Sequence, residues 1–282
     1  KLDFSIAITS TWSQTAWMAD LILPLSPYLE RESLIWQQDG LIPTFFMRRR
    51  CAEPQFETLS DWQIITGLAK ETGIQSLVFN SVEDIWKYQI ADTQVKLQDF
   101  DEKGYVRLTD RPKYGKVTSP YRFATPSGKI EVMGSPDQPL TGLAPYKNKQ
   151  KPTSGTFRLT VGGSGFHYGG STINNLLLNK QMPENLLWMN KEAGVQMGID
   201  DGDTVLVSVK DRSGRIRVKL TEFIHPEAIF MVTGFGRTLP VESRSYGKGL
   251  AANLLMPGGL DVVDSAGGGL AIQEQFVEIR KI

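Results

Sequence analysis

The chain has 282 residues, and its 31 basic and 31 acidic side chains give no net formal charge. This balance argues against a nucleic-acid-binding protein that neutralises phosphates over a broad basic face. Because Cys51 is the only cysteine, the chain alone can build neither a disulfide framework nor a structural zinc or iron–sulfur site. No apolar run approaches the roughly 20 residues that span a bilayer, so direct membrane insertion is not expected.

The first elements along the chain predict an α/β arrangement. Residues 4–9 and 20–24 have the apolar character of short buried strands, and residues 13–19 between them predict a helical turn or two. Strand–helix–strand units of this kind form parallel sheets, which collect ligands at the carboxyl ends of their strands. Since the sequence opens almost directly on the first strand, we expect it to be a fragment of a longer protein.

Two amphipathic helices are predicted next, over residues 60–73 and 81–91. The first begins with a capping box of Ser60 and Gln63 and stops at Gly73. The second begins with a serine that is followed three places later by an acid. The predicted apolar face of the first helix consists of Trp62, Ile65, Leu68 and Ala69.

The composition and hydrophobic pattern of the sequence then change twice. Residues 1–91 predict the end of an α/β domain, whereas residues 92–152, rich in Lys, Asp, Gly and Pro, predict a loop-rich connector. Residues 153–282 combine many short strands with glycine turns and one or two small helices, which indicates a closed β-barrel of six or seven strands. One of these helices is expected to begin after Asn190 as N-cap and to end at Gly198.

The clearest strand pattern lies in residues 204–222, where apolar and polar residues alternate. This alternation predicts a hairpin with its turn at Ser213–Gly214. The residues that we expect to share the inward face are Val205, Val207, Val209, Ile216, Val218 and Leu220.

Residues 161–179, VGGSGFHYGGSTINNLLLN, combine bare backbone with small hydroxyl side chains. The glycines, including Gly163 and Gly165, would let a ligand lie directly against peptide N–H groups. Ser164 and Thr172 add hydroxyl groups without adding bulk. This composition suits a phosphate or a polar heterocycle.

The same stretch contains a histidine and paired asparagines. Asn174 and Asn175 each offer a donor and an acceptor, which is the equipment for reading the edge of a purine or pterin. His167 could face a pyrophosphate or a pterin. The structural alternative is that the glycines turn the chain between two strands and that His167 bonds a nearby carbonyl, since the spacing matches neither a P-loop nor the Rossmann fingerprint.

The run HYGGSTINN resembles the start of the last domain in the molybdopterin-dependent oxidoreductases of the dimethyl sulfoxide reductase superfamily. That pattern has His, then Thr five residues later, then two Asn, which His167, Thr172, Asn174 and Asn175 match. The pattern often carries an arginine just before the threonine, where this sequence has Ser171.

Four further segments extend this resemblance over most of the chain in the right order. Residues 13–33 are similar to the family's Thr-Ala, Ala-Asp-x-x-Leu-Pro and Leu-Glu signature, and residues 125–131, TPSGKIE, to the connector before its last domain. Residues 186–236 resemble the passage from the small helix through Asp-Gly-Asp to the later strands, and residues 249–269 resemble the family's late Asn-Leu segment.

The resemblance implies a Rossmann-like domain for residues 1–91 and a double-psi-type β-barrel for residues 153–282. The barrel would bind molybdopterin guanine dinucleotide carrying molybdenum or tungsten. In relatives the metal is held by two such dinucleotides and usually by one side chain from a preceding domain. The residues that the resemblance assigns to cofactor binding are Thr15, Asp20, Gly163, Ser164, Gly165, His167, Thr172, Asn174, Asn175, Asn253 and Gln273.

The resemblance leaves catalysis itself to other parts of the enzyme. It implies no catalytic residue, no metal ligand in this chain, and an iron–sulfur cluster only in the missing N-terminal part. Cys51 is therefore expected to be a packed or half-exposed thiol. Arg48, Arg49 and Arg50 either meet a phosphate or partner, or form surface ion pairs. Asp20 either reads the guanine, or caps a helix or pins the start of a strand.

Within the superfamily, YLERES and FIHPEAIFMVTGFG are most similar to catalytic subunits of thiosulfate and polysulfide reductases. The implied function is reduction of an inorganic sulfur compound in anaerobic respiration. The implied partners are the rest of the catalytic subunit, an iron–sulfur electron-transfer subunit and a membrane anchor subunit, at the periplasmic face of a bacterial or archaeal membrane. The alternatives are an arsenate or tetrathionate reductase, a hydratase or hydrolase on the same frame, and a cofactor-free scaffold.

Overall fold

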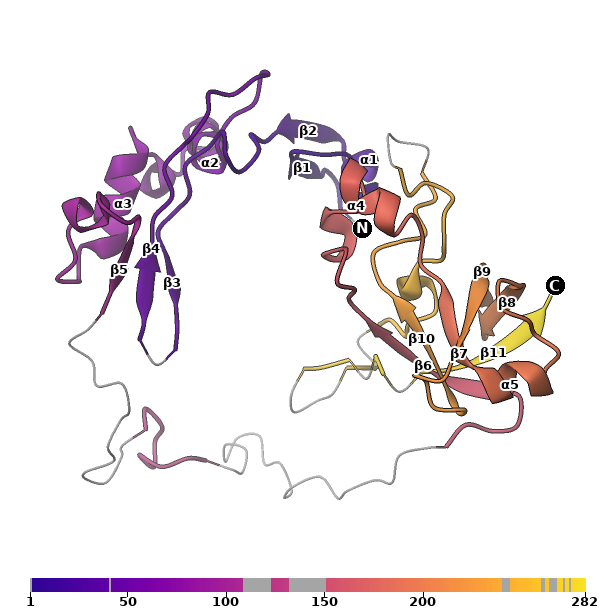
Figure 1. Cartoon of the computed structure of the whole chain (residues 1–282). Helices are drawn as coiled ribbons and strands as arrows, with labels where there is room; N and C mark the ends of the chain where they lie inside the picture. Colours follow the sequence, from indigo (N-terminus) through magenta and orange to yellow (C-terminus); the bar gives the residue numbers. More distant parts are fainter. Residues whose placement is uncertain are drawn as a thin grey trace. The chain divides into compact units, whose positions relative to one another are not determined.

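The computed structural model describes residues 2–40, 42–108, 123–131, 151–239, 244–259, 262–263, 268–270, 272–273 and 275–282 (Figure 1). The chain divides into two compact units. The first consists of Lys1–Thr11 and Met18–Tyr146, and the second of Trp12–Trp17 and Lys147–Ile282. The division between Tyr146 and Lys147 falls inside the connector that the sequence places at residues 92–152.

The first unit begins with a pair of parallel strands. β1 (Ile6–Thr9) and β2 (Leu21–Pro24) pair with Ile6 opposite Leu21, and α1 (Gln14–Met18) lies between them in the sequence. This confirms the predicted strand–helix–strand order and its parallel pairing.

Both amphipathic helices of the first unit begin at the predicted serines. α2 (Asp61–Glu71) has the capping box of Ser60 and Gln63. α3 (Val82–Ile90) is capped by Ser81, whose hydroxyl accepts a hydrogen bond from the Asp84 amide at 3.2 Å. Each cap satisfies an amide that the first helical turn would otherwise leave unpaired.

The predicted apolar face of α2 is partly wrong. Ala69 is buried as expected, but Ile65 is 43% exposed, and Ile64 and Thr66 are buried in its place. The Thr66 hydroxyl donates to the carbonyl of Leu77 at 3.3 Å, because the chain after the helix folds back through the 3₁₀ turn η1 (Gln75–Leu77). The burial of this side depends on that later segment, which the helical pattern alone does not contain.

A small antiparallel sheet in the first unit has no counterpart in the sequence predictions. Its strands are β3 (Trp36–Gln38), β4 (Thr44–Phe46) and β5 (Tyr105–Arg107), in that order. A 3₁₀ turn, η2 (Leu97–Phe100), precedes β5. The buried core of this region consists of Ile35, Met47, Val82, Trp86, Ile90 and Phe100.

The second unit is built around a closed barrel of six strands in the order β10-β6-β11-β8-β9-β7. The pairs β6–β10 and β7–β9 are parallel, and the other four are antiparallel. This closure confirms the predicted fold class, in which an α/β part is followed by a β-barrel. The strands are β6 (Thr156–Gly162), β7 (Leu187–Asn190), β8 (Thr204–Val209), β9 (Arg212–Thr221), β10 (Ala228–Val232) and β11 (Gln275–Lys281).

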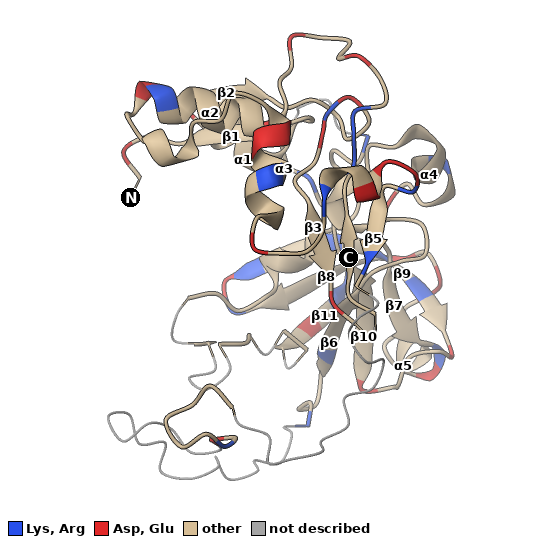
Figure 2. Ribbon diagram, turned by 90° about the vertical axis from the view of Figure 1, so that its left-hand side faces the viewer, with Lys and Arg blue, Asp and Glu red and all other residues tan. Residues whose placement is uncertain are grey.

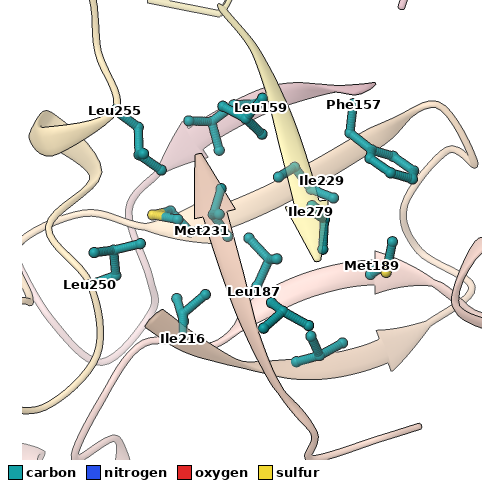
Figure 3. Packing of buried hydrophobic residues seen from close by; sticks show 14 of the residues in the cluster. Phe157, Leu159, Leu187, Met189, Ile216, Ile229, Met231, Leu250, Leu255 and Ile279 are labelled. Carbon is teal, nitrogen blue, oxygen red and sulfur yellow. The ribbon is translucent and has the colours of Figure 1, made fainter. Parts of the chain in front are cut away.

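Every strand of the barrel contributes apolar side chains to one core (Figure 3). Alternate residues point inward, as the period of two in a strand requires. Leu159, Leu187, Met189, Ile229 and Met231 are 0% exposed. Leu250 and Leu255, from the chain between β10 and β11, pack against the same cluster.

The hairpin of β8 and β9 confirms the predicted inward face but not the predicted turn. Val205, Val207, Val209, Ile216 and Val218 are buried, and Leu220 is half-buried. The turn lies at Lys210–Asp211, because Val209 pairs with Arg212 and Lys210 has a φ of 52°. Gly214 instead lies within β9, where a Cβ atom would overlap the side chain of Leu250. This glycine therefore permits close packing rather than a reversal.

Two short helices accompany the barrel. α4 (Leu176–Gln181) follows the glycine-rich stretch, and α5 (Lys191–Gln196) begins after Asn190, whose side chain accepts from the amides of Glu192 and Ala193. The cap at Asn190 was predicted, and α4 was not. Two 3₁₀ turns, η3 (Gly169–Ser171) and η4 (Ala252–Leu254), complete the elements.

Acidic and basic residues are both scattered over the ribbon, in keeping with the absence of net charge (Figure 2). None of the helices in the described part of the chain is long and apolar enough to span a bilayer.

Candidate functional site

A pocket of about 330 Å³ opens in the second unit. Its walls come from four segments that are far apart in the sequence: residues 13–15, Gly170, residues 233–237 and residues 251–253. The first belongs to the start of α1, the second to η3, the third follows β10 and the last includes η4. The chain thus passes directly from the end of β10 into the wall of the pocket.

Two glycines leave part of this wall without side chains. Gly234 and Gly236 have φ angles of 102° and 77°, in the left-handed region that favours glycine. A Cβ atom on Gly234 would lie 2.6 Å from the carbonyl carbon of Gly169, and one on Gly236 would overlap the backbone nitrogen of Ala251. The two glycines therefore hold three backbone segments in direct contact, and a ligand in the pocket would meet peptide groups.

Two of the eleven residues assigned by resemblance line the pocket, Thr15 and Asn253. Both are exposed. In the described part of the chain, neither side chain is engaged by another protein group, so one hydroxyl and one carboxamide are available to a ligand. A carboxamide offers both a donor and an acceptor to a heterocycle edge.

Arg237 is the one charged residue among the described residues that line the pocket, and it lies outside the residues predicted from the sequence. Its Nη2 atom donates to the carbonyl of Gly170 at 3.3 Å. Among the described residues, no acidic side chain lines the pocket, so its lining carries a positive charge together with peptide and hydroxyl donors. Such a site suits an anion or a polar ring.

His167 is buried, with 3% of its surface exposed, and it does not line the pocket. Its Nε2 atom lies 2.9 Å from the carbonyl oxygen of Met182, and its Nδ1 atom 3.3 Å from the hydroxyl of Thr172. The ring also packs edge-on against Phe235, with 5.4 Å between centroids. Because a carbonyl only accepts, Nε2 carries the proton and Nδ1 faces the hydroxyl. This is the structural alternative that the sequence left open.

The hydroxyls of the glycine-rich stretch bond to their own backbone. Ser164 Oγ accepts from the amides of Phe166 and His167 at 3.3 and 2.9 Å, and Thr172 Oγ1 accepts from the amide of Tyr168 at 2.8 Å. These contacts fix the bend that places Gly170 at the pocket. Gly163 and Gly165 are exposed and have open space where a side chain would begin.

The paired asparagines have separate local partners. Asn175 is the N-cap of α4, and its Oδ1 atom accepts from the amides of Leu177 and Leu178 at 3.0 and 3.1 Å. Asn174 Oδ1 accepts from the amide of Arg244 at 3.0 Å, and its Nδ2 group has no protein partner in the described chain. Neither asparagine lines the pocket with Asn253.

The remaining two assigned residues hold strands. Gln273 pairs with the backbone of Val161, accepting from its amide at 3.0 Å and donating to its carbonyl at 2.8 Å, so it extends the ladder beside β6. Asp20 accepts from the amide and the hydroxyl of Ser5 at 2.8 and 2.9 Å and thus pins the start of β2. These hydrogen bonds, first the one from the Ser5 hydroxyl, lower the pKa of Asp20 below its ordinary value.

Asn185 lies outside the predicted residues, although it is fully buried beneath the pocket wall. Its Nδ2 atom donates to the carbonyls of Val232 and Leu250 at 2.7 and 2.9 Å, and its Oδ1 atom accepts from the amide of Leu250 at 2.9 Å. It therefore ties together the two segments that continue into residues 233–237 and 251–253. Its only sequence signal is a polar residue directly before an apolar strand.

The charged run of the first unit forms ion pairs. Arg49 bonds Asp101 at 2.7 Å, and Arg50 lies near Glu32 and Glu53 at 3.9 and 3.3 Å. This favours the surface ion-pair interpretation for these two arginines.

The described residues offer little to bind a metal ion. Cys51 is exposed, and its Sγ atom lies 3.6 Å from the carbonyl oxygen of Arg49. Within the described residues, no group of three or more His, Cys, Asp or Glu side chains could hold a metal ion.

Comparison with known families agrees with this architecture. A profile described as molybdopterin dinucleotide binding domain matches residues 157–268, which include most of the barrel and the pocket wall except α1. A second profile, described as molybdopterin oxidoreductase, matches residues 1–71. The two matches confirm the resemblance that the motifs indicated.

Curated relatives carry different reductase activities in their names. The thiosulfate reductase molybdopterin-containing subunit of Salmonella typhimurium is 23% identical over 91% of this chain and 37% of its own length. The assimilatory nitrate reductase catalytic subunit of Bacillus subtilis is 29% identical over 82% of this chain and 33% of its own length. The chain thus spans about a third of the length of these relatives.

A solved structure shares the fold. The acetylene hydratase of Pelobacter acetylenicus superposes with a TM-score of 0.77 at 16% identity, covering 99% of this chain and 40% of that chain. At this identity, the likeness concerns the fold alone.

Proposed function

Because this chain belongs to the molybdopterin oxidoreductase family and contains its dinucleotide-binding domain, we propose that it holds the cofactor in the catalytic subunit of a molybdenum or tungsten enzyme. The cofactor would be molybdopterin guanine dinucleotide, and the pocket beside Gly234 and Gly236 would receive part of it. The single observation that carries this proposal is a pocket part of whose wall is bare backbone, because a Cβ atom on Gly234 or Gly236 would overlap neighbouring backbone.

The residues present fit such a group. A dinucleotide combines anionic phosphates with flat polar rings, and the pocket offers peptide groups, the Thr15 hydroxyl, the Asn253 carboxamide and a positive charge. Its volume of about 330 Å³ is at the lower end for small-molecule sites, so it would receive a part of the dinucleotide rather than all of it.

When bound, the cofactor supplies two-electron oxidation and reduction at its metal. The residues of this chain bind and orient it. Asn253 would hydrogen-bond a ring edge, and the peptide groups at Gly234 and Gly236 would lie against the ligand without a side chain between them. His167, Thr172 and Asn175 would act one step further out, because their hydrogen bonds hold the loop that carries Gly170.

For the substrate, we propose an inorganic sulfur compound such as thiosulfate or polysulfide. Support comes from the thiosulfate reductase relative, which aligns with 91% of the chain, and from the residues 28–33 and 223–236 that resemble this subgroup. The complete enzyme, purified and given a reduced viologen dye, should oxidise the dye fastest with thiosulfate or polysulfide. Fastest turnover with nitrate or arsenate would contradict this substrate class.

For the partners, we propose the rest of the catalytic subunit, an iron–sulfur electron-transfer subunit and a membrane anchor subunit. The sulfur-compound proposal requires a supply of electrons, which an electron-transfer subunit and a membrane anchor would provide. Affinity purification of the complete subunit from mildly solubilised membranes should yield an iron–sulfur protein in equal amount. A catalytic subunit that is recovered alone and fully active with a natural electron donor would contradict it.

We also propose the three-part division into residues 1–91, 92–152 and 153–282. The connector is rich in Lys, Gly and Pro, so limited trypsin digestion of the purified protein should cut there first. A first cut within the barrel strands would contradict the division.

The complete enzyme provides the direct test of the cofactor proposal. Acid extraction should release guanine nucleotide together with molybdenum or tungsten from the purified protein. A protein that is folded but releases neither would instead support the scaffold alternative.

A further inference from the structure

Arg237 contributes a guanidinium group to the pocket, and among the residues that the structure describes it has no carboxylate partner. Arg31, Arg49, Arg50 and Arg217 each lie within 4.0 Å of an acidic side chain. No such partner lies near Arg237 in the described part of the chain, where its one side-chain hydrogen bond goes to the carbonyl of Gly170. A half-buried cation without a counter-ion is costly, so this position favours binding of an anion.

The backbone holds this guanidinium in a defined place. A Cβ atom on Gly170 would lie 3.2 Å from Nη2 of Arg237, so the glycine makes room for the contact. On the other side, Gly236 keeps the chain of Arg237 against Ala251. One of the five N–H donors of Arg237 is used by the Gly170 carbonyl, and the other four remain for a ligand.

The Arg237 guanidinium lies at Gly170, the residue directly before Ser171. The family pattern often has an arginine at the position of Ser171, and this sequence lacks it. The structure brings a guanidinium to the adjacent backbone from 67 residues further along the chain. The positive charge is therefore present at this wall of the pocket, but a different segment supplies it.

We propose that Arg237 binds a phosphate oxygen of the dinucleotide and takes the place of the arginine that is absent at position 171. A guanidinium pairs with phosphate through two parallel hydrogen bonds, which gives orientation as well as charge. This inference rests on the proposed cofactor function and adds a residue that the motifs do not assign.

The test is chemical modification of the complete enzyme with phenylglyoxal, which attacks accessible guanidinium groups, followed by peptide mass spectrometry. Arg237 should be protected in the cofactor-loaded enzyme and become reactive when the cofactor is removed. Arg215, exposed on β9, serves as the internal control and should react equally in both forms. Equal reaction of Arg237 in both forms would overturn the proposal.

Added anions separate a phosphate site from a substrate site. In the cofactor-free enzyme, inorganic pyrophosphate should protect Arg237 and thiosulfate should not. Protection by thiosulfate alone would assign Arg237 to an anionic substrate and overturn the phosphate assignment. An enzyme that never contains guanine nucleotide would refute the proposed function itself, which is a different outcome.

Variants test whether the charge can be moved. Arg237→Gln should lower the guanine nucleotide content of the purified enzyme severalfold, whereas Arg215→Gln should leave it unchanged. Adding Ser171→Arg to Arg237→Gln should restore most of that content. The contradicting result is a Ser171→Arg single variant with native guanine nucleotide content and a double variant whose content stays as low as that of Arg237→Gln. In that case Arg237 does not replace the arginine that is absent at position 171.

Discussion

Asn185 and Leu250 are joined by two hydrogen bonds, one in each direction between the carboxamide and the peptide group. The same carboxamide donates to Val232, so one buried side chain clamps the ends of two segments that form the pocket wall. The shape of the candidate site thus depends on a residue that does not line it.

Asn185→Ala should destabilise the barrel because it leaves two buried carbonyls and one amide without partners. Each such group costs about 1–3 kcal/mol, so we expect a loss of about 3 kcal/mol or more in the free energy of unfolding. Thermal unfolding of the complete enzyme and hydrogen exchange of barrel peptides would measure it. Asn80→Ala, at an exposed position of the first unit, should change little; equal stability of both variants would refute the clamp.

Gly236→Ala should close or distort the pocket, because the added Cβ overlaps the backbone of Ala251 at a φ of 77°. We expect the nucleotide content of the purified enzyme to fall severalfold. Gly258→Ala is the matched control, because a Cβ atom on Gly258 would meet open space and the φ angle of this residue is not positive. Should Gly236→Ala keep its full nucleotide content, the bare-backbone wall would not be the binding surface.

Asn253→Ala should reduce cofactor retention severalfold without loss of stability, because the exposed side chain has no protein partner in the described chain to lose. Asn174→Ala removes the hydrogen bond to the Arg244 amide and should have a smaller effect. Molybdenum and nucleotide analysis of the two variants, alone and combined, would check this. Native metal content in the double variant would contradict the assignment of both asparagines.

Asp20 should make the pairing of β1 and β2 sensitive to acid. Its pKa is lowered by the Ser5 hydroxyl, so its stabilising contribution is complete above its ordinary pKa of 3.8 and is lost as the pH falls through the lowered value. The difference in stability between the native protein and Asp20→Asn should therefore be constant from pH 7 to about pH 5 and vanish in stronger acid. A difference that grows as the pH falls would have the wrong sign.

Local patterns in the sequence predicted the parts of the fold that depend on neighbours in the chain. The caps at Ser60, Ser81 and Asn190 and the inward valines of β8 are signals of this kind. The three-residue strands β3, β4 and β5 are too short to show a period, and the pairing of β4 with β5 joins residues about 60 apart. The sequence analysis placed the turn of this hairpin at Ser213–Gly214, whereas it lies at Lys210–Asp211. The error arose because Gly214, which packing against Leu250 requires, resembles a turn residue.

The candidate site was predictable only in part, for the same reason. Thr15 and Asn253 were assigned from the resemblance, and both line the pocket. The contact of Arg237 with Gly170 depends on the closed barrel, and no pattern in either sequence segment predicts it. Asn174 and Asn175, which the resemblance assigns to cofactor binding together with Asn253, do not line the pocket with it. Short polar side chains next to glycine bends often bond their own backbone, and sequence cannot separate that use from ligand binding.

Hydrogen exchange of the complete enzyme, with and without its cofactor, tests the central claim most directly. If the pocket holds the dinucleotide, amides in residues 233–237 and 251–253 should exchange much more slowly in the loaded enzyme, while those of β9 should be unchanged. Identical exchange of both pocket segments in the loaded and cofactor-free forms would contradict the account.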